Sequence, residues 1–343
     1  MKRLLNTLYV TTLESHLSRE GDTVLVKVDG EVKLQVPVHT LGSIVCFGPV
    51  FCTPALMGFC SERNVTITFL SVYGRFLARV QGRVSGNVLL RREQYRRADD
   101  AEFSASFAGN IVLAKISNSR TVIMRAGREQ GDSERSQALS QAAAELAFQL
   151  KSLAEPLDLP TLRGKEGDSA RTYFEVFNHL ITTQKDDFVF HQRSRRPPLD
   201  NVNALLSFIY TILSNDVSSA LEGVGLDPAV GYFHEDRPGR PGLALDIMEE
   251  FRSYLADRLV LNLINLKQVK PEGFVKTESG AVTMDDATRK TVLVEYQKRK
   301  QEEITHPFLD ERVSIGLLPH VQAMLLARFL RGDLDGYPPF IFR

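Results

Sequence analysis

The residues best suited to chemistry gather between Gly231 and Arg252, in the stretch G-Y-F-H-E-D-R-P-G-R-P-G-L-A-L-D-I-M-E-E-F-R. It contains a histidine, two prolines and, in its second half, three acids: His234, Pro238, Pro241, Asp246, Glu249 and Glu250. The prolines stiffen a loop that carries the histidine, and a helix carrying the acids is predicted to follow. Because residues three and four apart share a helix face, Asp246 is expected to point the same way as both glutamates. An imidazole beside several carboxylates suits a divalent ion such as Mg²⁺ or Mn²⁺.

An apolar stripe should position this helix. Leu243, Ile247, Phe251 and Leu255 recur every four residues, which predicts a buried face next to the acids. A simpler interpretation stays open at this point. Acids in the first turns of a helix favour the positive end of its dipole, and a lone loop histidine needs no ligand role.

A further acid, Glu166, lies in the run Thr161–Phe174 (T-L-R-G-K-E-G-D-S-A-R-T-Y-F). Two glycines flank Lys165 and Glu166, which predicts a tight turn, with Asp168 or Ser169 capping a helix that runs to about Ile181. Glu166 is then expected at a helix entrance, where an acid could also simply favour the dipole. The GxxxxGK[ST] pattern of a phosphate-binding loop is absent from the sequence.

Arginines precede a proline pair in the loop predicted over residues 185–200: Arg193, Arg195 and Arg196 come before Pro197-Pro198. The prolines exclude a helix there and hold these side chains on an extended segment. Asp200 or Asn201 should then cap an apolar core helix over residues 202–221. A guanidinium fork binds two phosphate oxygens at once, so such arginines suit phosphate recognition.

Composition narrows the class of protein. The 343 residues are 43% hydrophobic and 24% charged with a formal net charge of zero, as in an ordinary globular protein, so a nucleic-acid partner would need local basic patches. The three cysteines (Cys46, Cys52 and Cys60) lack a CxxC spacing, which favours free, buried thiols in a reducing compartment. No signal peptide or membrane-spanning run is recognised, so we expect a cytoplasmic protein that does not contact a membrane.

The order of predicted elements indicates an α+β fold with two domains: residues 1–95 form a small β-rich domain with one helix, and residues 96–343 form a larger α-helical domain. Strands are predicted at 23–28, 31–36, 43–47, 65–70, 75–80 and 87–90, with a helix that Thr53 and Pro54 begin. Arg91–Arg97 should be a charged connector, either a solvated face or a phosphate contact. Later elements are helices at 101–128, 133–153, 288–303 and 318–331, a continuation of the acid-bearing helix to about 269, and a hairpin at 273–283.

Several kinds of enzyme chemistry are excluded or disfavoured because their sequence motifs are missing. Pro238 breaks the HExxH motif that His234-Glu235 would begin, and GxSxG is absent. No GxGxxG follows a strand, which disfavours dinucleotide-dependent redox chemistry. Acids, a histidine and nearby arginines fit phosphoryl transfer, in which a metal ion neutralises charge on the phosphate.

These motifs together resemble a known family, the CRISPR-associated integrase that acquires new spacers. The run R-G-K-E-G at 163–167, with Ala170 and Tyr173-Phe174 behind it, is similar to the first metal-ligand motif of that family. Gly231 to His234 and P-G-L-A-L-D-I-M-E-E-F-R at 241–252 resemble the second and third motifs. Residues 196–200, 203–207 and 274–280 also match, and the opening and closing segments resemble the type I-C branch.

The resemblance implies an N-terminal β domain that dimerises and a C-terminal helical catalytic domain. By position, Glu166, His234 and Glu249 would be ligands of Mn²⁺ or Mg²⁺, Asp246 would be a catalytic acid that assists them, and Glu250 is a reserve candidate. Arg195, Arg196 and Lys276 are candidate contacts to DNA phosphates, weighed against solvated charges. Implied partners are double-stranded DNA fragments, CRISPR repeat DNA, a second copy of the chain, and a small ferredoxin-like protein that bridges two dimers.

The implied activity is that of a metal-dependent DNA endonuclease and integrase, in which 3′-hydroxyl ends of captured fragments join the CRISPR repeat by transesterification. Two alternatives stay open: a non-catalytic DNA-binding scaffold of the same fold, and a general repair nuclease acting on branched DNA.

Overall fold

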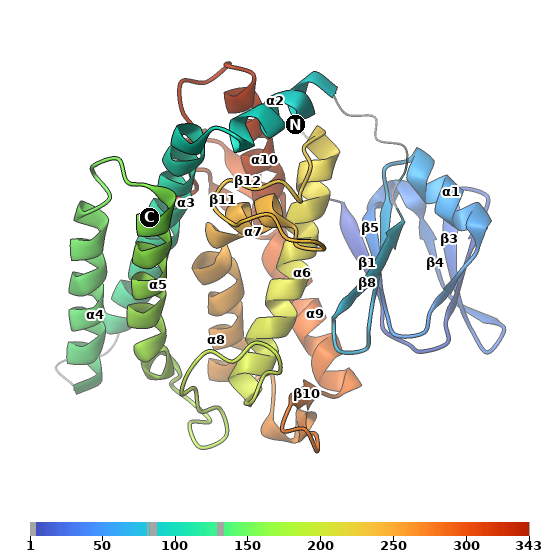
Figure 1. The fold of residues 1–343 in the computed structure, drawn as a ribbon. Helices are drawn as coiled ribbons and strands as arrows, with labels where there is room; N and C mark the ends of the chain where they lie inside the picture. The colour runs from blue at the N-terminus through green and yellow to red at the C-terminus, as the bar shows by residue number, and fades with distance from the viewer. Residues whose placement is uncertain (1–4, 81, 83–87, 129–133, 343) are drawn as a thin grey trace. The chain divides into compact units, whose positions relative to one another are not determined.

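A computed structural model describes residues 5–80, 82, 88–128 and 134–342 of the chain. It divides into two compact units, one of residues 1–85 with 284–302 and one of residues 86–283 with 303–343 (Figure 1). The first is rich in strands and the second is mainly helical, which confirms the predicted α+β fold class. The predicted boundary after residue 95 falls inside a helix, and a segment near the C-terminus belongs to the first unit.

Within the described part of the first unit, the strands form two four-stranded sheets in the orders β1-β5-β7-β8 and β4-β3-β2-β6. Strand β1 pairs parallel with β5, and β5 with β7, whereas β2, β3 and β4 form an antiparallel meander. The elements are β1 Asn6–Val10, β2 His16–Glu20, β3 Thr23–Val28, β4 Glu31–Pro37, η1 Val38–Thr40, β5 Leu41–Phe47, β6 Phe51–Cys52, α1 Pro54–Glu62, β7 Thr66–Leu70 and β8 Phe76–Val80.

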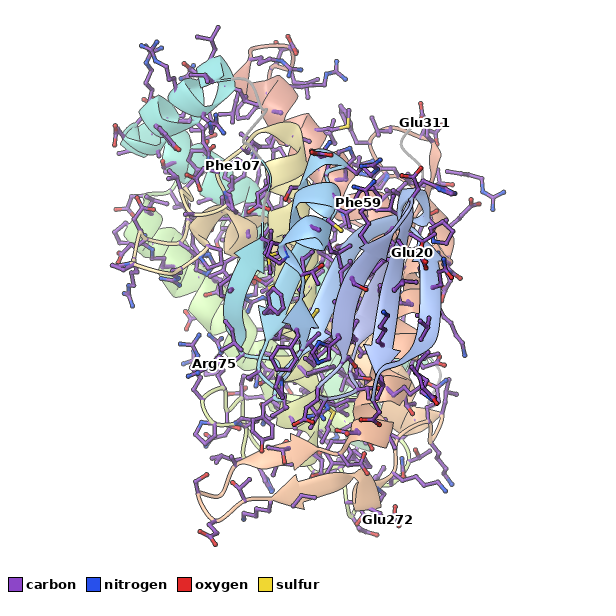
Figure 2. All side chains as sticks on the ribbon, turned by 90° about the vertical axis from the view of Figure 1, so that its right-hand side faces the viewer. Glu20, Phe59, Arg75, Phe107, Glu272 and Glu311 are labelled. Carbon is purple, nitrogen blue, oxygen red and sulfur yellow. The ribbon has the colours of Figure 1, made fainter. Side chains whose placement is uncertain are left out.

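Residues of both sheets and of α1 share one hydrophobic cluster, with Leu17, Ile44 and Leu56 fully buried in it. As predicted, Thr53 caps α1 by accepting a hydrogen bond from Leu56 N at 3.3 Å. The ring of Phe59, labelled in Figure 2, is buried beneath the guanidinium groups of Arg19 and Arg63. These contacts fasten α1 to its unit.

The cysteines of this unit are free, as predicted. Cys46 and Cys60 are buried and Cys52 is half-buried. Burial raises the pKa of the Cys46 thiol to about 12 and those of Cys52 and Cys60 to about 11. Thiols with such pKa values are poor nucleophiles at neutral pH.

Helix α9 (Asp286–Gln301) lies in sequence between two parts of the second unit but belongs to the first unit. Its N-cap Asp285 accepts a hydrogen bond from Thr288 N at 2.7 Å. Arg289 of α9 donates to Val72 O, and Gln297 Nε2 donates to Thr7 O at 2.9 Å. A segment about two hundred residues downstream therefore completes the β-rich unit.

The second unit contains most of the helices and two short two-stranded sheets. The elements are α2 Val88–Ala98, α3 Ala101–Arg128, α4 Glu134–Lys151, α5 Leu159–Glu175, η2 Phe177–Leu180, α6 Asn201–Val224, α7 Gly242–Glu249, η3 Arg252–Asp257, α8 Arg258–Asn265, η4 Pro271–Gly273, β9 Phe274–Lys276, β10 Val282–Met284, β11 Glu303–Thr305, β12 Arg312–Ser314, η5 Ile315–Leu317 and α10 Leu318–Leu330. Helix α3 packs against α4, α5 and α7, and α6 packs against α7 and α10. Helices α3, α4 and α5 stand side by side in Figure 1.

The predicted glycine turn around Glu166 was wrong. Helix α5 begins earlier, with Asp158 as its N-cap accepting from Thr161 N at 2.9 Å, and runs straight through Gly164 and Gly167. An Asp followed by a proline in the first turn was the true start signal. Glu166 consequently lies in mid-helix, one to two turns inside α5, and not at a helix entrance.

The predicted strand at 87–90 and the connector at Arg91–Arg97 were also wrong, because residues 88–98 form helix α2; Asn87 lies outside the described residues. A short apolar run such as Val88-Leu89-Leu90 fits either structure, and the charged residues after it are good helix formers. Arg97 pairs with Glu93 at 2.9 Å, one helical turn apart.

The continuous helix predicted up to about residue 269 is interrupted instead. It consists of α7, the π-helical segment η3 and α8. Around Glu250 and Phe251 the backbone bonds tighten to i→i−3, and the chain then widens into η3. The side chains of Glu249 and Arg252 lie on either side of this change.

Other elements were predicted with closer boundaries. The predicted strand at 23–28 and helix at 101–128 match β3 and α3, and Asp200 caps α6. The start predicted for α4, at residue 133, lies outside the described residues. The short strands β1, β2, β11 and β12 were not predicted, since segments of only three to five residues are too short to show a clear alternation in polarity.

Helix α6 alone, among the described helices, is long and apolar enough to cross a membrane by length and composition. Of its most apolar window, 67% is buried inside the structure. That burial fits the core helix of a folded unit, as the sequence predicts.

Candidate metal centre

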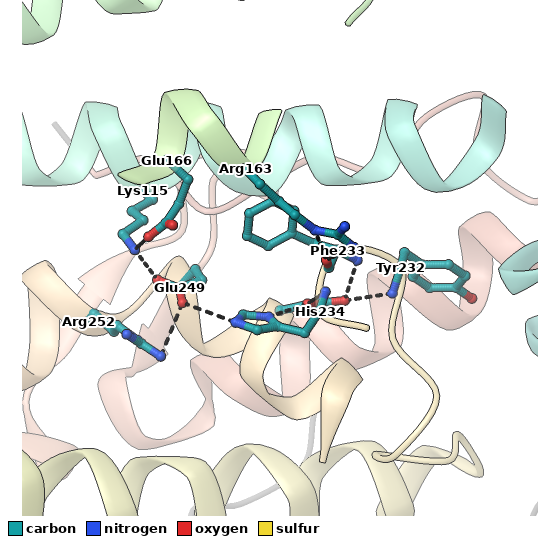
Figure 3. A network of polar contacts seen from close by, with 9 residues as sticks. Lys115, Arg163, Glu166, Tyr232, Phe233, His234, Glu249 and Arg252 are labelled. Atoms are coloured by element: carbon teal, nitrogen blue, oxygen red, sulfur yellow. Dashed lines mark hydrogen bonds and ion pairs between the residues drawn. The ribbon is translucent and has the colours of Figure 1, made fainter. Parts of the chain in front are cut away.

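The structure brings Glu166, His234 and Glu249 to one place in the helical unit (Figure 3). Glu166 comes from α5, His234 from the loop before α7, and Glu249 from the last turn of α7. A fourth residue, Lys115 of α3, lies between the two glutamates. Three helices and a loop therefore meet around one ammonium group.

Lys115 was not predicted as part of the site. Its Nζ donates a hydrogen bond to Glu166 Oε1 and lies 2.7 Å from Glu249 Oε2. The second contact is a close ion pair that helps to keep Glu249 charged. The signal available in the sequence was position: Lys115 lies four residues after Ile111 and three before Asn118, on a buried helix face, where lysine is rare unless paired.

Asp246 holds the histidine and is fully buried. Its Oδ2 accepts from Tyr232 N at 2.7 Å and Phe233 N at 3.0 Å, and its Oδ1 accepts from His234 N at 2.9 Å. His234 Nδ1 lies 2.7 Å from the same Oδ1, which assigns the ring proton to Nδ1 and leaves a lone pair on Nε2. Asp246 is therefore placed to orient the imidazole, with its lone pairs already occupied.

The lone pair of the imidazole is directed into the site. His234 Nε2 lies 3.9 Å from Glu249 Oε1. Arg163 of α5 fastens the loop, since its guanidinium donates to Phe233 O at 3.1 Å and pairs with Glu235 at 2.7 Å. A carboxylate behind an imidazole that faces a second carboxylate is the usual surrounding of a metal-ligating histidine.

Glu249 is ionised although only 3% of its side chain is exposed. Burial alone would raise its pKa, but the Arg252 and Lys115 cations outweigh burial and hold the pKa of Glu249 at about 2. The Arg252 guanidinium lies 3.1 Å from Oε1. These neighbouring cations therefore keep a deeply buried carboxylate charged in the metal-free protein.

Glu250 does not share the site, contrary to the predicted common face. It is buried on the other side of the helix, where Tyr337 Oη and Gln322 Nε2 donate to it at 2.6 and 2.8 Å and Phe340 N donates at 2.8 Å. Burial raises the pKa of Glu250 to about 7 despite these donors. Adjacent helical residues point about 100° apart, which separates Glu249 from Glu250.

A cavity of about 20 Å³ adjoins the site. Its lining includes four cationic side chains, those of Lys115, Arg193, Arg195 and Arg252, and one acid, Asp257. Within the described residues, buried Arg193 Nε and Arg252 Nε have no hydrogen-bond partner. Unsatisfied buried donors around a space of this size favour a water molecule there.

The candidate DNA contacts are placed differently from one another. Arg195 is exposed and lines the cavity. Arg196 and Lys276 are exposed, the latter on β9, and neither is part of the lining. Arg193, which the sequence analysis grouped with them as a loop residue, reaches further in and contacts Asn203 Oδ1 at 2.6 Å.

The donor set fits a divalent ion in chemistry. Two carboxylates and an imidazole nitrogen are ligands of Mg²⁺ or Mn²⁺, and the Lys115 ammonium shows that their common space attracts a cation. In the described part of the chain, no three His, Cys, Asp or Glu side chains already stand close enough to hold a metal. The Lys115 ammonium instead contacts both carboxylates.

The fold and the site together define a class: two-unit α+β proteins whose helical unit gathers carboxylates and an imidazole at one cation-binding position. The chain belongs to the CRISPR-associated Cas1 family, whose model, described as "CRISPR associated protein Cas1", matches residues 8–298. It is 52% identical to "CRISPR-associated endonuclease Cas1 1" of Chlorobaculum tepidum and 49% identical to the protein of that name from Moorella thermoacetica, each over the full length of both chains.

Solved structures share the fold at lower identity. The Cas1 protein TM1797 of Thermotoga maritima has a TM-score of 0.82 and 24% identity, covering 97% of this chain and 99% of that one. A casposase bound to an integration product has a TM-score of 0.82 and 20% identity, covering 97% and 92%. A Cas6-RT-Cas1–Cas2 complex contains a chain with a TM-score of 0.81 and 23% identity, covering 99% of this chain and 36% of that one.

Proposed function

We propose that this chain is a metal-dependent DNA integrase of CRISPR adaptation. Its substrates are a captured double-stranded DNA fragment and the CRISPR repeat. The observation that carries the proposal is the convergence of Glu166, His234 and Glu249 from α5, the loop and α7. Family membership and the endonuclease names of full-length relatives support it.

In the proposed reaction a fragment's terminal 3′ oxygen forms a bond to a repeat phosphorus. The bond from that phosphorus to the 3′ oxygen of the neighbouring repeat nucleotide breaks, and the proton lost by the attacking hydroxyl is balanced by one gained at the leaving oxygen. Glu166, His234 and Glu249 would hold Mn²⁺ or Mg²⁺, which when bound supplies charge neutralisation at the phosphate and a lower effective pKa of the attacking hydroxyl.

The chain's own residues would orient the reacting groups. Asp246 keeps the imidazole in one tautomer and one direction, and Arg163 keeps its loop against α5. The cations around the cavity give a phosphate a place beside the acids. Arg195, Arg196 and Lys276 would contact phosphates farther along the DNA and fix its register without reading sequence.

The wider setting is also a proposal. The chain would act in the cytoplasm as a homodimer, two of which are bridged by a small ferredoxin-like partner; a solved complex that contains Cas1 and Cas2 supports a protein partner of this kind. Placement in the type I-C branch rests on the resemblance of its opening and closing segments. Mixing the purified chain with candidate small partners and weighing the complexes by light scattering tests the assembly.

An integration assay tests the activity. Supercoiled CRISPR plasmid, Mn²⁺ and a short duplex are incubated with the protein, and joined products are resolved on a gel. Glu166→Ala and His234→Ala should each abolish joining and leave duplex binding largely intact. Glu175→Ala, an exposed acid on the same helix α5, is the matched control and should join at the normal rate.

The assay also separates the alternatives. Joining that survives both substitutions would falsify the enzymatic assignment and leave a DNA-binding scaffold. Metal-dependent cutting of branched DNA, without joining at any repeat, would indicate a repair nuclease. Neither alternative is favoured by the family match or by the relatives' names.

A further inference from the structure

The position that a divalent ion needs is already taken by a charged group of the protein. The Lys115 ammonium contacts both Glu166 and Glu249, the two carboxylates of the proposed ligand set. Of its side chain, 12% is exposed, against 24% for Glu166 and 3% for Glu249. This contact therefore lies inside the site and not on its rim.

The position of Lys115 is fixed by rigid elements. It lies on the long helix α3, which packs against both α5 and α7. One turn further along α3, Asn118 Nδ2 donates to Glu250 O at 2.8 Å and to Phe340 O at 2.9 Å. Asn118 ties α3 to the C-terminal end of α7, so the Cα atom of Lys115 stays close to Glu249. Only the flexible side chain of Lys115 can move.

An ammonium and a divalent ion cannot share this space. Ammonium–carboxylate contacts have N···O distances of about 2.7–2.9 Å, whereas Mg²⁺ lies about 2.1 Å from its oxygens. The same carboxylate oxygens can therefore close around a metal only after the ammonium has left. Repulsion between like charges acts in the same direction.

Charge balance indicates where the displaced group goes. Glu166 and Glu249 together carry two negative charges, which a divalent ion neutralises. The Lys115 ammonium, now paired with both glutamates, would then lack a counter-ion. It lines a small cavity together with three arginines and one acid, Asp257, and this excess of positive charge favours an anion such as a DNA phosphate at the mouth of the cavity.

We infer that Lys115 is an exchangeable cation: it neutralises Glu166 and Glu249 in the metal-free protein, a divalent ion displaces it, and the released ammonium then binds a DNA phosphate at the mouth of the adjoining cavity. The inference rests on the proposed function, because it concerns the same metal site. It assigns a role to a residue that lies outside the ligand set and makes DNA binding at this spot conditional on the metal.

Mn²⁺ titration of the whole protein, without DNA and followed by electron paramagnetic resonance, tests the displacement. Lys115→Gln should bind Mn²⁺ about five- to tenfold more tightly than the wild type, because no ion pair has to be broken first. The matched control is Arg195→Gln, which also removes a cation from the cavity lining. Among the described residues Arg195 forms no ion pair with Glu166 or Glu249, so the Mn²⁺ affinity of this variant should stay within about twofold of the wild-type value.

Two results would overturn the displacement. One is an Mn²⁺ affinity of Lys115→Gln equal to or weaker than that of the wild type. The other is equal tightening in Arg195→Gln, which would mean that any nearby positive charge has this effect. Lys115→Arg, which keeps the charge, should return the affinity toward the wild-type value and guards against a folding defect in the glutamine variant.

A second measurement follows the released ammonium. Binding of a short duplex is compared in saturating Mn²⁺ and in EDTA. Lys115→Gln should weaken binding about threefold or more in Mn²⁺ and leave it unchanged in EDTA, where the wild-type ammonium is held by the acids. Equal weakening in both conditions would show a constant phosphate contact and no exchange.

Failure of this inference can be told apart from failure of the proposed function. If the wild type binds no Mn²⁺, or binds it equally well after Glu166→Ala and His234→Ala, the proposed metal site is wrong. If those substitutions abolish Mn²⁺ binding while Lys115→Gln leaves it unchanged, the site stands and the exchange does not.

Discussion

At the scale of single residues, the four acids near the site have different partners and therefore different roles. Glu166 and Glu249 face the Lys115 ammonium, Asp246 is saturated with donors from the loop, and Glu250 faces the opposite side. The sequence showed which residues are acids, but it did not show where their side chains point. A spacing of three or four residues fixes the angular position of a side chain around the helix axis only to within about 50°, which cannot separate two adjacent glutamates.

Asp246→Asn tests the positioning role. An amide offers one acceptor oxygen in place of two, so at least one backbone N–H of Tyr232, Phe233 or His234 would face an NH₂ group. We expect a loss of about 1–3 kcal/mol in the free energy of unfolding and Mn²⁺ binding weakened about 10- to 100-fold. Urea denaturation and Mn²⁺ titration measure these; Asp236→Asn, in an exposed part of the same loop, should change neither.

Asp257 gives a pH dependence of stability. Burial raises its pKa to about 6 from a normal value of 3.8, even though Tyr210 Oη donates to its Oδ1 at 2.6 Å. A raised carboxyl pKa means that the folded state holds its proton longer, so this contribution to stability is complete below about pH 4 and is lost as pH rises to about 6.

The matching substitution is Asp257→Asn, which mimics the protonated acid at every pH. Between pH 4 and pH 6 the wild type should lose up to about 1.4 kcal/mol per pH unit from this group, and the variant should not. Unfolding in urea across that range records the slope. Identical slopes for both proteins would mean that Asp257 is already ionised when folded.

At the scale of elements, the loop before α7 depends on a close backbone crossing. A Cβ added to Gly231 would lie 2.7 Å from Gly242 C and 2.8 Å from Asp246 Oδ2, and a Cβ on Gly242 would lie 2.7 Å from Ala229 O. Both glycines are required for close approach and not for a special φ. Glycines in α5 have no such function, because added Cβ atoms at Gly164 and Gly167 meet nothing within 4 Å.

Alanine substitutions at Gly231 and Gly164 should therefore act in opposite directions. Gly231→Ala should push the loop away from Asp246, cost about 1–3 kcal/mol of stability, and weaken Mn²⁺ binding by displacing His234. Gly164→Ala should raise stability by about 0.5–1 kcal/mol, as alanine does in a helix interior. Thermal denaturation of the two variants and the wild type measures both changes in stability. A Gly231→Ala variant more stable than the wild type would show that the backbone approach at Gly231 is not close.

At the scale of the whole molecule, the fold class and the three converging side chains could be predicted from the sequence. The lysine that bridges two of these side chains could not. Apolar periodicity located α3, α6 and the strand β3, since burial leaves a repeating pattern in sequence. Lys115 leaves no such pattern, because its partners are about fifty and more than a hundred residues away. The sequence gives no local sign that residues 284–302 belong to the β-rich unit for the same reason, because their contacts cross long separations along the chain.

Arg289→Ala tests the two-unit division. Arg289 is 7% exposed and its guanidinium joins α9 to Val72 O within the β-rich unit, so its removal should cost about 1–3 kcal/mol. Mn²⁺ affinity should not change, because every proposed ligand belongs to the helical unit. Calorimetry and Mn²⁺ titration measure the two effects, with the exposed neighbour Lys290→Ala as the neutral control.

The π-helical segment between α7 and α8 is a place where the chain carries one residue more than regular winding needs. Its hydrogen bonds reach five residues along the backbone, one more than in an ordinary helix. Deleting a single residue from Arg252–Asp257 would let the segment relax to regular winding while the helices on either side keep their directions, whereas a deletion inside α7 or α8 would turn everything after it by about 100°. In a scan of one-residue deletions read out by soluble yield, we expect this stretch to tolerate shortening better than α7 or α8.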